Sequence, residues 1–467
     1  MTVIEAKQGL TPDGWCADLR VTLGADGRIA AVEPAGPGRK GPSERPGESG
    51  SVHRVDMLLP APVNLHSHSF QRAMAGLTEA RGPDRQDSFW TWRRLMYRYL
   101  EQLGPEDIEA IAAQVFVEML EAGYAGVAEF HYLHHAVAGR PYGNLAELSG
   151  RIVAAAEAVG IGLTLLPVLY QWGGCDGRAL EGGQRRFGNT PAQYLRLHEA
   201  AGALIAAGPA DFALGVAPHS LRAVDAAGLA AALDVAGDGP VHMHLAEQLA
   251  EVDEVLAHRG ARPAEWLFDA HEVGAHWCLI HCTQMTAQET LALARSGAVA
   301  GLCPITEANL GDGIFNGVAY LSAGGRLGFG SDSNLHIAYF DELRALEYSQ
   351  RLRDRTRAAL ARPDQSSGRV LVEAAQRGGA QAAGRASGQI AVGQWGDLLG
   401  ICTDSAWLCN RRGDAALDTL VFGGHGQRAV QDVWSAGRHV VREGKHALRD
   451  PVAARFRQVV QRLGQEI

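Results

Sequence analysis

Residues 57–70 read MLLPAPVNLHSHSF, an apolar run that ends in two histidines. It opens a series of eight short apolar runs, and the stretches between them, such as 105–123 and 286–297, carry apolar residues at helical spacing. The later runs are AGVAEFHY (125–132), IGLTLLPVLY (161–170), FALGVAPHS (212–220), PVHMHLAE (240–247), WCLIHCT (277–283), GAVAGLCP (297–304) and RLGFGSDS (326–333). Strands that alternate with helices predict a parallel sheet, and eight repeats predict its closure into a (β/α)8 barrel.

A doubly wound open sheet is the competing architecture for such an alternation. It would typically carry a glycine-rich phosphate loop after the first strand, and no such loop follows the first apolar run. We therefore expect an α/β fold in which a TIM-like barrel spans residues 56–390.

The two ends of the chain differ from its middle. Short strands joined by Gly-rich turns are predicted at 18–36, 388–402 and 428–446. We expect residues 1–55 and 391–467 to combine into one small β-sandwich domain, with a helix at the C-terminal end. Residues 36–50, GPGRKGPSERPGESG, are rich in Gly, Pro and charge, which predicts an exposed connection.

The composition excludes several classes of protein. Hydrophobic residues make up 46% of the 467 residues, which suffices for a sizeable core. The formal net charge of −9 argues against a nucleic-acid partner, which needs a basic surface. We expect a cytoplasmic protein without a membrane partner, because the N-terminus has no apolar segment and no apolar run is long enough to span a bilayer. The seven cysteines form no CxxC pair, so neither a disulfide framework nor a thiolate zinc site is expected.

Polar side chains capable of catalysis stand at the ends of the apolar runs. In a (β/α)8 barrel the active site is built at the carboxyl ends of the strands, so this placement predicts one shared site. The residues concerned are His66, His68, Glu129, His131, Tyr132, His219, His242, His244, Glu247, His281 and Asp332.

The pair His66 and His68 predicts a metal site. Residues i and i+2 of a strand point to the same side, so both imidazoles can reach one cation from the barrel axis. A third histidine from the fifth run and Asp332 from the eighth complete a ligand set that suits Zn²⁺, with Fe²⁺ as the alternative. His242 and His244 compete for the third place, and His244 is preferred because it is nearer the strand end.

Two further side chains are candidates for proton transfer and substrate polarisation. Glu247 lies just beyond the fifth run and fits a proton-shuttling carboxylate, although a glutamate at a helix start is the competing interpretation. His281 ends the sixth run and could polarise the substrate or hold the attacking water. A histidine satisfied within the core is the alternative for His281.

Several motifs together closely resemble the formimidoylglutamate deiminases of the amidohydrolase superfamily. The resemblance covers almost the whole chain, including a β-sandwich built from both ends. The motifs that carry it are NLHSHSFQRAMAGL (64–77), DSFWTWRRLMYR (87–98), AEFHYLHH (128–135), PHSLRAV (218–224), HMHLAEQ (242–248), TEANLGDGIF (306–315) and GSDSN (330–334). One departure from the family pattern is Pro304, which can shift the loop that carries Glu307 and Asn309.

The resemblance assigns a role to each site residue. It implies a metal held by His66, His68, His244 and Asp332. It implies that the formimino group is surrounded by Gln71, His219, Glu247 and His281. It also implies that the substrate's carboxylates are gripped by Arg93, Tyr132 and Arg222. Two arginines suit a small dicarboxylate, because guanidinium binds carboxylate through a planar, bidentate fork.

The shortage of lysine bears on the number of metal ions. Two-metal barrel hydrolases of this kind generally bridge their metals with a carboxylated lysine at the end of the fourth strand. Here that strand ends in Ala217, Pro218 and His219, and the only lysines of the chain are Lys7, Lys40 and Lys445. We therefore expect one Zn²⁺ per subunit. Independently of the metal site, the protein is expected to form a homodimer.

The reaction that the resemblance implies is hydrolysis of N-formimino-L-glutamate to N-formyl-L-glutamate and ammonia, a step of histidine degradation. Asp332 would help to deprotonate the attacking water, His281 would stabilise the tetrahedral intermediate, and Glu247 would pass a proton to the leaving nitrogen. Two rivals stay open: a deaminase of a guanine- or adenine-like ring, and a non-catalytic binding protein that kept the barrel.

Overall fold

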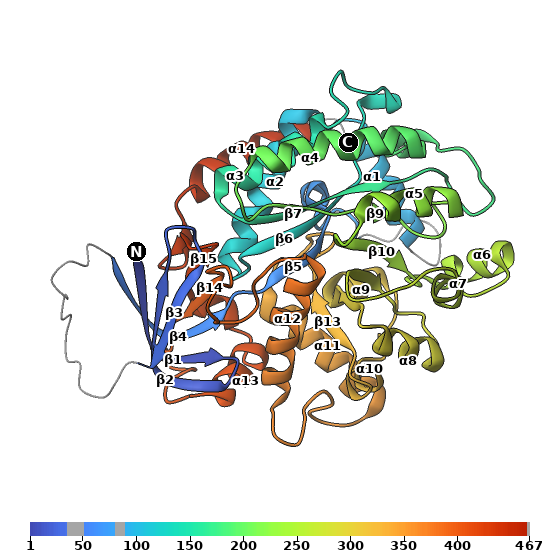
Figure 1. Ribbon diagram of the computed structural model, residues 1–467. Coiled ribbons are helices and arrows are strands. Elements are labelled where there is room, and N and C mark those ends of the chain that lie inside the picture. Colours follow the sequence, from blue (N-terminus) through green and yellow to red (C-terminus); the bar gives the residue numbers. More distant parts are fainter. Residues whose placement is uncertain (35–50, 80–88, 465–467) are drawn as a thin grey trace.

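The computed structural model describes residues 1–34, 51–79 and 89–464, and its centre is a closed barrel of parallel strands (Figure 1). The barrel strands are β5 (Val63–Ser67), β6 (Gly126–His131), β7 (Gly162–Leu169), β8 (Ala213–Leu214), β9 (Ala217–Pro218), β10 (Val241–Leu245), β11 (Trp277–His281), β12 (Val299–Leu302) and β13 (Arg326–Phe329). Parallel bridges from Ser67 to Asp332 and from Val216 to Val241 join the two halves. Because β8 and β9 share the fourth position, eight positions surround the axis, and the predicted barrel is confirmed.

Helices lie around the outside of these strands (Figure 1). The α-helices are α1 (Phe89–Leu100), α2 (Pro105–Glu121), α3 (Glu147–Val159), α4 (Pro191–Ala207), α5 (Ala226–Ala236), α6 (Leu249–Arg259), α7 (Pro263–Ala270), α8 (Ala287–Ser296), α9 (Pro304–Leu310), α10 (Gly317–Ser322), α11 (Tyr339–Asp354), α12 (Ser367–Ala382), α13 (Asp414–Phe422) and α14 (Arg449–Leu463). The short 3-10 helices are η1 (Ser69–Met74), η2 (Val137–Gly139), η3 (Gly182–Arg186) and η4 (Gly426–Ala429).

The helix α8 shows why these segments are helical. The Thr286 hydroxyl accepts from the backbone N–H of Glu289 at 3.2 Å, and the Glu289 carboxylate accepts from the N–H of Thr286 at 2.7 Å. This reciprocal capping satisfies donors that the first helical turn leaves unpaired. Gly297 ends the helix with φ of +81°, a conformation that glycine adopts without strain.

Both chain ends enter one mixed sheet beside the barrel, where the blue N-terminal strands of Figure 1 lie next to red C-terminal ones. Its strands, in spatial order, are β17 (Lys445–His446), β16 (Arg438–Arg442), β15 (Val430–Ser435), β14 (Leu398–Ile401), β4 (Val52–Pro60), β1 (Thr2–Thr11), β2 (Gly14–Leu23) and β3 (Ile29–Pro34). The antiparallel pairing of β14 with β4 joins the two ends of the chain, as the sequence predicts.

The expected small β domain built from both ends of the chain is confirmed, and its eight strands form one hydrogen-bonded sheet within the described residues, because β14 pairs with β4. The expected boundary between residues 55 and 56 falls inside β4, and Met57, Leu58 and Leu59 pair with neighbours in this sheet. The barrel therefore begins at Val63, after the two residues Ala61 and Pro62 that separate β4 from β5. The predicted connection at 36–50 lies outside the described residues.

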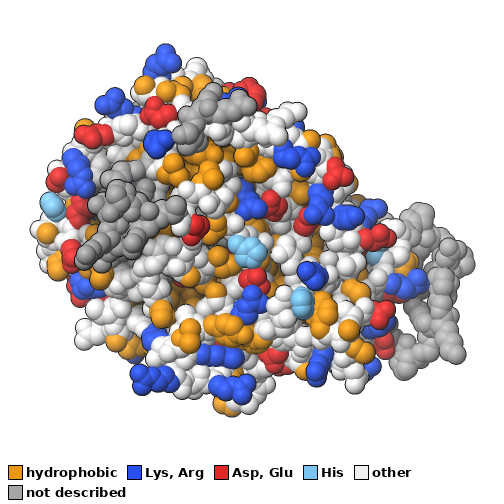
Figure 2. All heavy atoms as spheres, turned by 180° about the vertical axis from the view of Figure 1, so that it is seen from behind, with side chains coloured by type: hydrophobic (Ala, Val, Ile, Leu, Met, Phe, Trp, Pro, Cys, Tyr) orange, Lys and Arg blue, Asp and Glu red, His pale blue; other side chains and the backbone are white. Residues whose placement is uncertain are grey.

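The distribution of surface charge and the character of the helices are relevant to the expected absence of nucleic-acid and membrane partners. Acidic and basic side chains are interspersed over the face shown in Figure 2. Among the described helices, none combines the length and the apolar character needed to cross a membrane. All cysteines are free thiols, and Cys278, Cys282 and Cys303 are buried, as expected for small core residues.

Candidate active site

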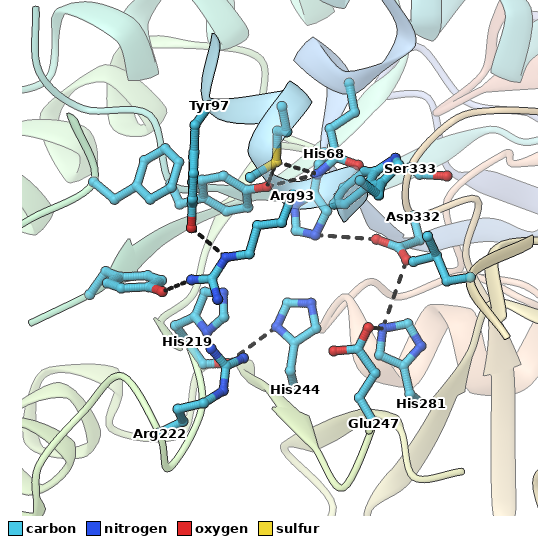
Figure 3. Close-up of a pocket in the computed structure, with 17 residues that line it drawn as sticks. His68, Arg93, Tyr97, His219, Arg222, His244, Glu247, His281, Asp332 and Ser333 are labelled. Atoms are coloured by element: carbon cyan, nitrogen blue, oxygen red, sulfur yellow. Dashed lines mark hydrogen bonds and ion pairs between the residues drawn. The ribbon is translucent and has the colours of Figure 1, made fainter. Parts of the chain in front are cut away.

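A pocket opens at the carboxyl ends of the barrel strands (Figure 3). It contains all but one of the residues to which the family resemblance assigns a role, namely His68, Gln71, Arg93, Tyr132, His219, Arg222, His244, Glu247, His281 and Asp332. The remaining one, His66, is fully buried, and its ring lies 4.7 Å from that of His68 and 4.8 Å from that of His244. The predicted convergence of the strand ends is thus present.

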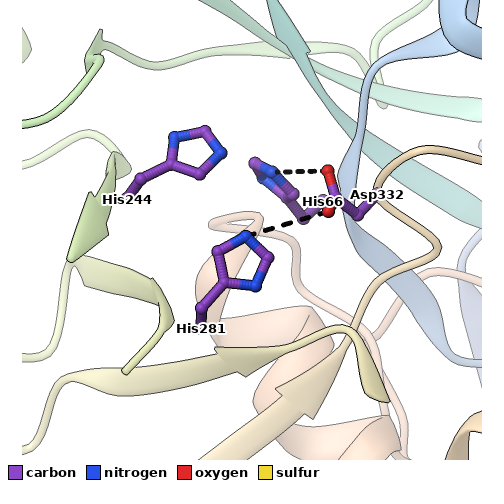
Figure 4. Close-up of side chains that lie close together, drawn as sticks. All are labelled: His66, His244, His281 and Asp332. Atoms are coloured by element: carbon purple, nitrogen blue, oxygen red, sulfur yellow. Dashed lines mark ion pairs between the residues drawn. The ribbon is translucent and has the colours of Figure 1, made fainter. Parts of the chain in front are cut away.

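A cluster of four buried groups could hold a metal ion: His66, His244, His281 and Asp332 (Figure 4). One ligand atom from each lies within 4.8 Å of the others. This group differs from the predicted ligand set, because it contains His281 where the sequence analysis has His68. His68 nevertheless borders the cluster, with its Nε2 atom 3.2 Å from Oδ1 of Asp332.

The orientation of the rings favours metal binding by His68 and His244. The Nδ1–H of His68 donates to the Phe130 carbonyl at 3.0 Å, and that of His244 donates to the His219 carbonyl at 3.2 Å. In each ring the other nitrogen, Nε2, is left with its lone pair for a cation. Both ring nitrogens of fully buried His66 have no hydrogen-bond partner in the described structure, which fits a role as a metal ligand.

Close packing of strand ends brings Asp332 to the histidines. The N–H of Asp332 donates to the His66 carbonyl at 2.9 Å, and the N–H of His68 donates to the Asp332 carbonyl at 3.0 Å. Gly330 makes this approach feasible, because a Cβ atom there would lie 2.7 Å from the backbone oxygen of His66.

Left-handed backbone conformations direct the side chains of three site residues into the pocket. Ala246, which precedes Glu247, has φ of +49°, and the φ values of His281 and Asp332 are +70° and +45°. Non-glycine residues rarely adopt such angles, and those that do cluster at functional sites. The regular alternation of side chains therefore stops at the strand ends, where the chain turns these groups into the pocket.

Burial and neighbouring charges set the protonation of the cluster. Burial lowers the pKa of His66 to about 3, and burial together with neighbouring imidazoles lowers the pKa of His244 well below its usual value. Burial disfavours charge on Asp332, but contacts with His66 and His68 hold the pKa of this carboxyl well below its ordinary range. Neutral imidazoles beside an ionised carboxylate form a donor set that suits a divalent cation.

Glu247 and His281 lie on the opposite side of Asp332 from His68. The Nε2 atom of His281 is 3.8 Å from Oε1 of Glu247 and 3.8 Å from Oδ2 of Asp332. Burial raises the pKa of Glu247, with His281 as the main opposing influence. Burial also disfavours charge on His281, but the carboxylates around it raise its pKa well above the usual value. This arrangement can move a proton near the metal cluster.

The outer part of the pocket contains polar groups bound to one another. Nε2 of Gln71 donates to the Tyr132 hydroxyl at 2.7 Å. Arg93, on α1, donates from Nη2 to the Tyr170 hydroxyl at 2.7 Å and from Nε to the Tyr97 hydroxyl. Arg222 is only 4% exposed and lines the same pocket. Two guanidinium groups thus face the cavity from different elements.

Two tyrosines of this pocket are absent from the sequence prediction. Tyr170 directly follows β7 at the end of the third apolar run, so the rule that selected the other strand ends would also have selected it. Tyr97 lies one helical turn after Arg93 on α1, and this i, i+4 spacing was a second available signal.

Three histidines near these motifs lie outside the pocket. His242 donates from Nε2 to the Ala382 carbonyl at 2.7 Å, so the choice of His244 over His242 agrees with the geometry. His131 and His134 are buried with their rings 5.4 Å apart and do not line the pocket. The fourth barrel position ends at His219 and carries no lysine.

Comparisons with known proteins agree with this geometry. Residues 57–440 match the model of the amidohydrolase family, and residues 1–47 match the N-terminal domain of formimidoylglutamate deiminase HutF. The chain is 50% identical to a formimidoylglutamate deiminase of Pseudomonas aeruginosa over 98% of its own length and 99% of the relative's.

Solved structures show the same architecture. An amidohydrolase from Brucella melitensis superposes with a TM-score of 0.92 at 44% identity, covering 99% of this chain and 100% of the other. A zinc-bound adenosine deaminase from Xanthomonas campestris shares the fold, with a TM-score of 0.81 at 22% identity and coverage of 99% and 98%. The chain therefore belongs to the amidohydrolase family and, within it, to the formimidoylglutamate deiminases.

Proposed function

We propose that this protein hydrolyses N-formimino-L-glutamate to N-formyl-L-glutamate and ammonia, a step of histidine degradation. The observation that carries the proposal is one pocket that combines a buried histidine and aspartate cluster with two guanidinium groups. The cluster supplies hydrolytic chemistry, and the guanidinium groups suit a substrate with two carboxylates. The 50% identity to the Pseudomonas aeruginosa deiminase supports the same substrate.

We further propose that His66, His68, His244 and Asp332 hold one divalent cation. Three neutral nitrogen donors and one carboxylate favour Zn²⁺, with Fe²⁺ as the alternative. His281 is the competing fourth ligand, since it belongs to the compact cluster around Asp332. When bound, the cation would lower the pKa of a water molecule towards ~7 and polarise the carbon–nitrogen double bond.

The chain's own residues would carry the protons. Asp332 Oδ2 would accept a proton from water as its oxygen bonds to the formimino carbon. Glu247, whose Oε1 lies 3.8 Å from His281 Nε2, would deliver a proton to the imino nitrogen. His281 would orient the new hydroxyl, whose proton passes to the amino nitrogen as the C–N bond breaks and the C=O bond forms. The proton that Asp332 took from water would return to Glu247. One water is consumed and one ammonia leaves, so the atoms balance.

The other pocket residues would select the substrate. Arg93 and Arg222 would bind its carboxylates, and Tyr132 and Gln71, already joined by a hydrogen bond, would fix its orientation. His219, which ends the fourth barrel position, would contact the formimino end. A neutral purine ring gains nothing from two cations, and this disfavours the ring deaminases as a model for this site.

Ammonia release tests the proposal directly. Purified, zinc-loaded protein is given formiminoglutamate, formiminoaspartate, guanine and adenine, and ammonia is measured together with metal content. We expect release from formiminoglutamate at a kcat/KM at least ~10²-fold above that of the other compounds. Release from a purine alone would favour a ring deaminase, and metal-loaded protein inert towards the whole panel would favour a binding protein. The homodimer stays a prediction that light scattering can test.

A further inference from the structure

The side chain of His281 enters the pocket against the pattern of its own strand. Along β11, Cys278 and Ile280 pack in a small cluster with Leu65, whereas Leu279 packs in the large cluster that includes helix side chains. Strict alternation would send His281 the same way as Leu279. The positive φ of His281, +70°, followed by +53° at Cys282, reverses this direction. A ring turned by a strained backbone needs a contact that fixes its rotation.

Glu307 supplies such a contact. Its Oε1 atom lies 3.3 Å from Nδ1 of His281 and also accepts from the backbone N–H of Cys303 at 2.8 Å. Glu307 stands in the first turn of α9, which Pro304 begins, and only 4% of it is exposed. Pro304, expected to disturb this loop, instead starts the helix that carries Glu307, because proline is well tolerated at the first helical position. The carboxylate is thus held in place from two sides.

The contact also determines which ring nitrogen of His281 faces the groups proposed to transfer protons. A carboxylate oxygen accepts hydrogen bonds, so the Nδ1 atom that faces Glu307 carries a proton. The opposite atom, Nε2, then faces Asp332 and Glu247, each at 3.8 Å. We propose that Glu307 is a positioning residue that fixes the His281 ring and directs Nε2 towards the reacting groups. This inference rests on the proposed function, in which His281 acts at the formimino carbon.

A purely structural role for Glu307 is the alternative. A matched control comes from α11, whose Glu342 also binds the start of α9. The Glu342 carboxylate accepts from the backbone N–H of Ile305 at 2.9 Å and is fully buried. Both carboxylates therefore satisfy donors at the start of α9. Of these two carboxylates, only that of Glu307 contacts His281 in the described structure. A capping role predicts similar behaviour for both residues, whereas a positioning role predicts different kinetics.

The experiment compares Glu307→Gln, Glu307→Leu and Glu342→Gln as zinc-loaded enzymes, with kcat, KM and metal content measured for each. We expect Glu307→Leu to lower kcat by about 10- to 100-fold with little change in KM. Glu307→Gln keeps an accepting oxygen and should retain most of the activity. Glu342→Gln should lower the unfolding midpoint but leave kcat within about threefold of the wild type.

A spectroscopic measurement on the wild type tests the proposal even if the Glu307 variants fail to fold. Histidine ring ¹⁵N spectra, assigned by the signal that His281→Gln lacks, should show Nδ1 of His281 protonated. An unprotonated Nδ1 would overturn the proposal. So would a metal-loaded Glu307→Leu enzyme with wild-type kcat, or an equal loss of kcat in Glu342→Gln. A wild type inert towards formiminoglutamate would instead refute the proposed function and leave the ring measurement interpretable.

Discussion

Arg385 joins the barrel to the terminal sheet, and its removal should be costly. Its guanidinium binds Asp397 through Nε at 2.6 Å and Nη2 at 2.9 Å, and it binds Asp211 through the carbonyl at 2.7 Å and Oδ2 at 3.0 Å. The Asp397 side chain is fully buried and that of Asp211 is 2% exposed. Asp211 also pairs with Arg438, whose side chain is 37% exposed. Within the described contacts, Asp397 has Arg385 as its only cationic partner.

Arg385→Met should therefore lower the free energy of unfolding by about 3–5 kcal/mol, because Asp397 is left buried without a counter-charge. Arg438→Met leaves Asp211 paired with Arg385 and should cost about 1 kcal/mol or less. Urea denaturation of the two variants and the wild type measures both losses. The double variant Arg385→Met with Asp397→Leu should recover part of the loss, since no unpaired charge remains. The reasoning is refuted if Arg385→Met loses no more than Arg438→Met.

Three further predictions concern pH and the pocket. Burial lowers the pKa of His131 from 6.5 to about 3, so below pH 6.5 the unfolded chain binds a proton that the folded chain excludes. His131 alone should therefore lower the free energy of unfolding by about 1.4 kcal/mol for each unit that the pH falls. The variant His131→Gln lacks this contribution, so its urea midpoint should depend less on pH between pH 6 and 4. Glu247→Gln should keep its metal and lose about 10²–10⁴ in kcat; near-normal turnover would exclude proton transfer by Glu247. Arg222→Met should raise KM for formiminoglutamate about 10- to 100-fold, whereas an unchanged KM would mean that Arg222 does not bind a carboxylate.

The barrel could be predicted from sequence because each buried strand is short, apolar and followed by a polar end. The limit of this signal appears in the first run. Met57 to Pro60 belongs to the terminal sheet and Val63 to Ser67 to the barrel, although both segments are apolar and buried. Hydropathy measures burial, and it does not state which sheet buries the strand. Only Pro60 at the end of the first segment and Pro62 between the segments indicate a break.

The site was predictable where side chains follow the strand pattern. His244 lies at a regular position on β10. The HxH spacing identifies His66 and His68, although β5 shifts register after Asn64 and ends before His68. The family motif identifies Arg93 and Arg222. The pattern did not indicate that His281 joins the compact cluster around Asp332, because its direction depends on a positive φ. Left-handed residues other than glycine have no reliable sequence signature, since tertiary contacts impose them.

On β10, two histidines on the same face of the strand have different roles at different levels of the barrel. His242 and His244 point to the same side, and two residues of a strand separate them by about 6.6 Å along the strand. At the lower level His242 donates to the Ala382 carbonyl, which satisfies a buried backbone acceptor. At the upper level His244 uses Nδ1 for the His219 carbonyl, and its other nitrogen is directed towards His66 and Asp332. Depth in the barrel, rather than residue type, therefore separates a structural histidine from a metal-binding one.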